Sequence, residues 1–165
     1  MKKQKGFSLI ELLIVVAIIL IIAAIAIPNL LRSRMAANEA SAVGSLRTIN
    51  TEEVTYETNY TTIGFAANLG ALGGTAVACA SATGASSAGA CLIDDVLSQT
   101  GVKSGYAFTA VGTAGTGSPI LVIYTSTALP SVVGQTGQRA FCSSQSGVIR
   151  QNLTGTACAN TDPAL

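Results

Sequence analysis

The longest apolar run of the chain lies near its N-terminus and predicts a helix that can cross a membrane. Every residue from Leu12 to Ile27 is apolar, and in the preceding stretch from Phe7 only Ser8 and Glu11 interrupt the pattern. A helix over residues 7–27 is about 31 Å long, close to the hydrocarbon thickness of a bilayer. Three lysines lie within the first six residues, which predicts a cytoplasmic N-terminus.

The helical pattern continues beyond Pro28 but becomes amphipathic. Residues 29–57 contain no proline and are rich in Ala, Leu, Arg and Glu. Apolar residues recur at helical spacing and should face inward: Leu31, Met35, Ala42, Val43, Leu46 and Ile49. We expect the charged residues to face solvent: Arg32, Arg34, Glu39 and Arg47, followed by Glu52, Glu53 and Glu57.

Strand patterns follow at short spacing in the C-terminal half. They cover residues 106–111, 120–125, 139–142 and 148–151, and are rich in β-branched and aromatic residues. Because short turns without helices join them, these strands should run antiparallel. The sequence therefore predicts an α+β fold, in which the amphipathic helix packs on a roughly four-stranded antiparallel sheet.

The segment between helix and strands is rich in Gly, Ala, Ser and Thr and predicts little regular structure. Residues 92–97 are an exception, with the pattern of a helical turn. Asp94 and Asp95 in this turn are more typical of a surface turn or a helix cap than of a Ca²⁺ site, which needs six to eight oxygen ligands.

Composition argues against several classes of function. The chain of 165 residues is 49% hydrophobic and 10% charged, with a net charge of +1, so no basic face for nucleic acid is expected. It contains no histidine, the commonest general base and metal ligand. We expect no catalytic residue, no cofactor and no metal, and therefore not an enzyme.

Glu11 is not explained by simple targeting. An ordinary signal peptide with a cut after Ala24-Ile25-Ala26, and a plain single-pass anchor, both fit the apolar run. Neither has a use for a carboxyl group within it, and such groups are by default functional.

The segment Lys5–Ile19, KGFSLIELLIVVAII, closely resembles the cleavage signal of type IV pilins and type II secretion pseudopilins. The resemblance implies that a prepilin peptidase cuts between Gly6 and Phe7 and methylates the new amine of Phe7. It also implies that Glu11 is needed for subunit assembly and that Pro28 kinks the helix.

A physical reason for the glutamate can be given separately. A free α-amino group is largely positive at neutral pH, and in the apolar centre of a filament it needs a partner. The Glu11 carboxylate of a neighbouring subunit would supply it.

The resemblance implies four parts: a leader over residues 1–6, a transmembrane and assembly helix over 7–28, its amphipathic second half over 29–57, and a globular pilin domain over 58–165. The subunit would be stored in the inner membrane with its N-terminus in the cytoplasm. The pilus assembly machinery would then add it to a homopolymeric surface filament. A major pseudopilin and an unpolymerised, membrane-anchored binding domain stay open as alternatives. Adhesion, twitching motility, DNA uptake, electron transfer and secretion stay open as roles.

The cysteines all follow the apolar run, which places them outside the cytoplasm. Their even number in an oxidising compartment indicates two disulfides, with three possible connectivities. We favour Cys79–Cys91 and Cys142–Cys158, because each pair closes a weakly structured loop. The second pair also resembles the disulfide-bounded C-terminal loop of many pilins.

Overall fold

The computed structural model describes residues 7–80 and 84–165, and the chain divides into two compact units, Met1–Arg34 and Met35–Leu165. Helix α1 (Leu9–Asn59) contributes to both units and is 51 residues long. Within the described part of the chain it is the one helix that is long and apolar enough to cross a membrane, judged by length and composition. Pro28 lies inside α1, and the residues on both sides of it are helical.

The first unit presents apolar side chains to its surroundings. Between Phe7 and Leu31 the large apolar side chains are 44–80% exposed. Leu31 itself is 52% exposed, so the prediction that it faces a core is wrong. The inward-facing stripe begins later, where Met35 is half-buried.

The second unit is built on an antiparallel sheet with the strand order β1-β2-β3-β4-β5. The strands are β1 (Val102–Lys103), β2 (Tyr106–Ala114), β3 (Leu121–Pro130), β4 (Ala140–Ser144) and β5 (Arg150–Asn152). The described residues therefore form five strands where the sequence predicted about four. The additional strand, β1, has only two residues, too few to produce an alternating pattern.

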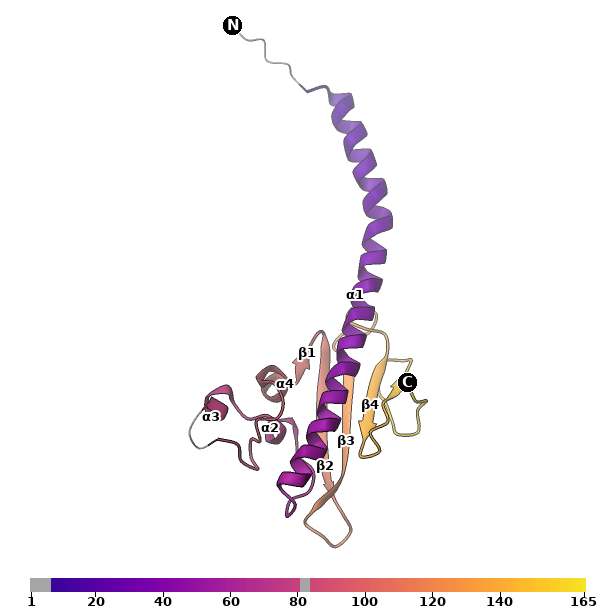
Figure 1. The fold of residues 1–165 in the computed structure, drawn as a ribbon. Coiled ribbons are helices and arrows are strands. Elements are labelled where there is room, and N and C mark those ends of the chain that lie inside the picture. The colour runs from indigo at the N-terminus through magenta and orange to yellow at the C-terminus, as the bar shows by residue number, and fades with distance from the viewer. Residues whose placement is uncertain (1–6, 81–83) are drawn as a thin grey trace. The chain divides into compact units, whose positions relative to one another are not determined.

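Residues 35–59 of α1 lie along one face of this sheet (Figure 1). The helix contributes Ala42, Leu46, Ile49 and Tyr56 to the core, and the sheet contributes Tyr106, Phe108, Ala110, Ala128 and Phe141. These contacts confirm the α+β architecture and the helix-on-sheet packing predicted from the sequence.

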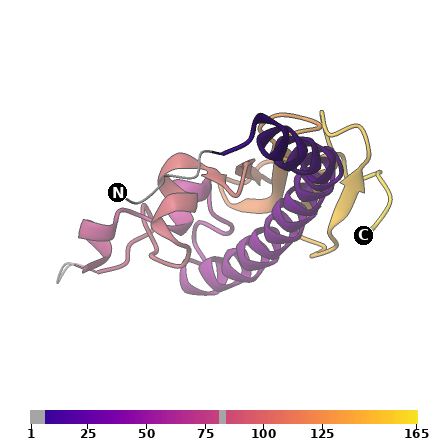
Figure 2. The same cartoon turned by 90° about the horizontal axis from the view of Figure 1, so that it is seen from above.

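Among the described residues between α1 and β1, the chain forms three short helices: α2 (Leu69–Leu72), α3 (Ala76–Ala80) and α4 (Asp95–Thr100). Figure 2 shows them on one side of residues 35–59 of α1 and the C-terminal strands on the other. The helical turn expected at 92–97 is present but begins three residues later, because Asp94 caps it rather than forming part of it.

Candidate functional site

Glu11 lies in the first turn of α1 and accepts a hydrogen bond from Ser8, the residue that precedes the helix. The backbone N–H of Ser8 donates to Glu11 Oε2 at 2.9 Å. Ser8 and Glu11 thus have the spacing and the backbone contact of a capping box, which satisfies an N–H that the helix leaves free. This role of Glu11 was not predicted from the sequence, although Ser-x-x-Glu before an apolar run is its usual signal.

The other residues implied by the resemblance occupy the same unit. Phe7 is 80% exposed and directly precedes Ser8. Pro28 lies nearly five helical turns after Glu11 and has no N–H to give to the carbonyl four residues before it. Gly6, the expected cleavage position, and the whole leader 1–6 lie outside the described residues.

Beyond this capping box, the first unit offers mainly an apolar surface. Its large exposed side chains are aliphatic from Leu9 to Leu31. Burying one such side chain is worth about 1.5–3 kcal/mol, so the segment as a whole strongly favours lipid or protein over water. An exposed apolar surface of this kind is suited to contact with lipid or with other apolar protein surfaces.

In the second unit, Glu39 forms an ion pair at the start of β4. Glu39 Oε1 accepts the backbone N–H groups of Gln138 and Arg139 at 2.9 and 3.1 Å. Glu39 Oε2 accepts Arg139 Nε at 2.9 Å and its terminal nitrogen at 2.8 Å. Burial alone would raise the pKa of Glu39, but the N–H of Gln138 and the Arg139 contacts outweigh it and hold that pKa below its usual value. Glu39 is buried, so the prediction that it faces solvent is wrong.

Glu53 is also buried, against the prediction of a solvated glutamate face. Its side chain is fully enclosed, because it faces the segment that follows α1 rather than solvent. Glu53 Oε2 accepts the backbone N–H of Ala66 at 2.8 Å, while Oε1 has no hydrogen-bond partner among the described residues.

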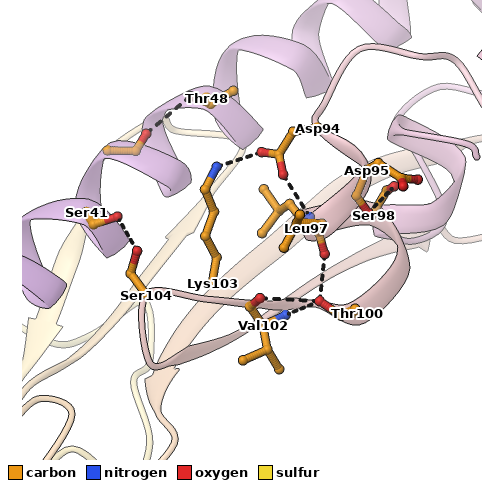
Figure 3. Close-up of polar contacts among 12 residues, drawn as sticks. Ser41, Thr48, Asp94, Asp95, Leu97, Ser98, Thr100, Val102, Lys103 and Ser104 are labelled. Atoms are coloured by element: carbon orange, nitrogen blue, oxygen red, sulfur yellow. Dashed lines mark hydrogen bonds and ion pairs between the residues drawn. The ribbon is translucent and has the colours of Figure 1, made fainter. Parts of the chain in front are cut away.

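Asp94 caps the N-terminus of α4, which is one of the two roles predicted from the sequence. Asp94 Oδ1 accepts the N–H of Leu97 at 3.0 Å, and Oδ2 accepts Lys103 Nζ at 2.7 Å (Figure 3). Burial acts to raise the pKa of Asp94, but these two donors outweigh it and lower that pKa. Within residues 7–80 and 84–165, no group of three or more His, Cys, Asp or Glu residues is placed to hold a metal ion.

The structure joins the cysteines as Cys79–Cys91 and Cys142–Cys158, with Cα–Cα distances of 5.7 and 5.6 Å. These are the two pairings favoured from the sequence. The first links α3 to the segment before α4, and the second links β4 to the C-terminal loop.

Comparison with known proteins decides what the N-terminal residues represent. Residues 1–27 match the family described as the prokaryotic N-terminal methylation motif. This chain carries that motif. Phe7 and Glu11 lie within the methylation motif, and Pro28 follows directly after it.

The chain is also similar to two curated pilins. It is 64% identical over 39 residues to the type IV wide pilus major component PilA4 of Thermus thermophilus, covering 24% of this chain and 30% of that protein. It is 43% identical over 54 residues to the type IV major pilin protein PilA of Myxococcus xanthus, covering 33% of this chain and 24% of that protein. The aligned part of the chain thus spans less than a third of either relative. No solved structure matches the chain significantly.

Proposed function

We propose that this chain is a structural subunit of a type IV pilus-like filament, with no catalytic role of its own. The observation that carries the proposal is the methylation motif over residues 1–27, placed on an apolar helix that continues into a folded α+β domain. The similarity to two type IV pilins supports the same assignment.

Processing would convert a membrane-stored precursor into the assembling form. A prepilin peptidase would cut between Gly6 and Phe7 at the cytoplasmic face and methylate the Phe7 amine. The three lysines before the apolar run support this orientation. The subunit would have a single span in the inner membrane, and the assembly machinery would then transfer it to a homopolymeric surface filament.

Glu11 would act in assembly as the partner of a neighbouring subunit's Phe7 amine. Its contact with Ser8 N–H does not exclude this role, because an ionised carboxylate has about four acceptor positions and the contact uses one of them. An amine left unpaired in the apolar centre of the filament would cost several kcal/mol or lose its proton. Repeated at every subunit, such a cost would prevent growth.

Intact-mass analysis of sheared surface filaments tests the processing step. The expected mature chain begins at N-methylated Phe7. A chain beginning at Ile27 would identify an ordinary signal peptide and remove the proposal. Processed chain that stays in the membrane, with no filament containing it, would favour the unpolymerised binding domain.

Two substitutions separate the charge of Glu11 from its capping contact. Glu11→Val removes both, whereas Glu11→Gln keeps an oxygen that can accept Ser8 N–H and removes only the charge. We expect both variants to insert and to be processed, and both to lose most of the filament yield. Wild-type filament yield from Glu11→Gln, beside a loss in Glu11→Val, would mean that helix capping and not ion pairing is what Glu11 supplies.

A further inference from the structure

Glu53 is a buried carboxyl group for which filament assembly gives no explanation. Its relative exposure is 0%, and among the described residues only the N–H of Ala66 is hydrogen-bonded to it, through Oε2. The other oxygen, Oε1, is buried without a hydrogen-bond partner in the described part of the chain. A buried carboxylate in this situation is costly unless it binds a proton or gains access to water.

The bond from Glu53 fixes a segment that connects α1 to two strands. Residues 63–68 follow α1, and Phe65 N–H donates to Leu121 O while Leu121 N–H donates to Ile63 O, both at 2.8 Å. Gly112 N–H donates to Ala67 O at 3.3 Å. The segment therefore pairs with the start of β3 and with β2, and Glu53 connects it to the helix.

The neighbouring titratable groups do not neutralise Glu53. Tyr56 on α1 and Tyr124 on β3 are close enough to interact with it electrostatically. Both hydroxyls donate elsewhere: Tyr56 to Ser87 O at 2.6 Å and Tyr124 to Asn50 Oδ1 at 3.1 Å. Both ion pairs found among the described residues involve other carboxylates.

Because Glu53 is buried without a cationic partner among the described residues, the folded state favours its protonated form. Burial raises the pKa of Glu53 to about 7, against the opposing effect of the Ala66 N–H. In the unfolded chain the group has an ordinary value near 4.5. Between these two values the folded state binds more protons than the unfolded state, so stability falls as the pH rises from about 4.5 to 7.

We propose that Glu53 is a proton-binding site that latches residues 63–68 onto α1. With the proton bound, the carboxyl is neutral and the segment stays docked between the helix and the strands. When the proton leaves, a charge without a cationic partner remains in the core, and the segment opens to bring water to Oε1. The latch belongs to the folded domain and does not depend on filament assembly.

Urea unfolding of the full chain in detergent, measured from pH 4.5 to 8, tests the proton site. Glu53→Gln imitates the protonated group, and Glu57→Gln is the matched control, because Glu57 is an exposed glutamate one turn further along α1. Relative to Glu53→Gln, the unfolding equilibrium constant of the wild type should rise by up to about tenfold per pH unit between the two pKa values, and by roughly 100-fold from pH 4.5 to 8. Glu57→Gln should follow the wild type. Parallel curves for the wild type and Glu53→Gln would overturn the proposal.

Two measurements locate the effect and keep the test valid if Glu53→Gln does not fold. The carboxyl carbon of Glu53 in the wild type should titrate near pH 7 by NMR, and a midpoint near 4.5 would overturn the proposal. Hydrogen exchange at pH 8, corrected for the intrinsic effect of pH, should show that Ala66 opens more often than the whole domain unfolds, while Leu46 in the core opens only by global unfolding. Equal opening free energies at both amides at pH 8 would refute a local latch.

Discussion

Glu39→Ala should be among the most destabilising single substitutions in residues 35–59 of α1, the part of the helix that packs on the sheet. The substitution removes the acceptor for two backbone N–H groups, those of Gln138 and Arg139, which lead into β4. It also removes the hydrogen bond from Arg139 Nε and the ion-pair contact of the terminal guanidinium nitrogen. That guanidinium keeps a bond to Gln151 Oε1 at 2.7 Å and stacks over Phe141 at 5.4 Å, so it stays at the domain surface without its anion.

The size of the effect follows from the number of bonds and their access to water. A hydrogen bond to a charged group contributes about 1.5–3 kcal/mol, and four such bonds would give an upper limit well above any realistic loss. Arg139 is 36% exposed against 11% for the Glu39 side chain, so water will solvate much of what the substitution frees. We therefore expect a loss of about 2–4 kcal/mol for Glu39→Ala.

Glu39→Gln tests how much of the effect is due to the charge of Glu39. Its amide oxygen can still accept from the two backbone N–H groups, so we expect a loss of only about 1–2 kcal/mol. Because the pKa of Glu39 is lowered in the folded state, its stabilising effect is present above pH 4.5 and is lost as the pH falls through the folded value. The difference between the wild type and Glu39→Gln should therefore shrink on acidification below pH 4.5.

The assay is urea unfolding of the full chain in detergent, followed by the near-ultraviolet circular dichroism of its tyrosines, since the chain has no tryptophan. A double-mutant cycle with Arg139→Ala should give a coupling energy of about 1–2 kcal/mol. A loss below about 0.5 kcal/mol for Glu39→Ala, the range of ordinary surface substitutions, would show that these contacts do not stabilise the domain. So would a coupling energy of zero.

Two further predictions concern glycine positions and a disulfide. Gly137→Ala would place a methyl group against the hydroxyl and ring of Tyr106, and we expect it to lower the free energy of unfolding in urea by about 1–3 kcal/mol. Gly44 lies in mid-helix with open space around it, so Gly44→Ala should instead raise the free energy of unfolding by up to about 1 kcal/mol. Replacing Cys142 and Cys158 together by serine should lower the free energy of unfolding by about 3 kcal/mol. Non-reducing peptide mapping of this variant should still show the Cys79–Cys91 disulfide. An unchanged free energy of unfolding would show that the C-terminal loop is held in place without its disulfide.

Local patterns are sufficient to predict most of the fold. The apolar run and the helical spacing that follows it place α1. The alternation around Phe108 places β2, and the β-branched and aromatic residues around Tyr124 place the first half of β3. These predictions succeed because periodicity reports directly on which side chains can share one buried face. The sequence left three connectivities open for the cysteines, and the structure has the one that we favoured.

The buried glutamates could not be predicted in the same way, although their positions contain a signal. Glu39, Ala42, Leu46, Ile49, Glu53 and Tyr56 recur at alternating intervals of three and four residues and form the buried stripe of α1. Charge alone suggested that both glutamates face solvent. A carboxylate can occupy such a stripe when groups distant in sequence meet it, and Arg139 meets Glu39 across a separation of 100 residues. Neither that donor nor the position of Ala66 can be inferred from local sequence.

The two glutamates lie fourteen residues apart on one stripe, and their surroundings make them respond to pH in opposite directions. Around Glu39 the chain supplies four donors, so folding favours the ionised form and acidification removes stability. Around Glu53 it supplies one, so folding favours the protonated form and stability falls as the pH rises from about 4.5 to 7. Asp162 Oδ2 accepts the N–H of Ala159 at 2.9 Å and Asn152 Nδ2 at 3.1 Å, and these donors lower the pKa of Asp162. The lowered pKa values of Asp94 and Asp162 act in the same sense as that of Glu39. We therefore expect the folded domain to be most stable near pH 4.5, because Glu39 loses its stabilising effect below that pH and Glu53 loses its effect above it. The position of each carboxyl on the helix decides that it is buried, and the number of donors that reach it decides the charge it carries there.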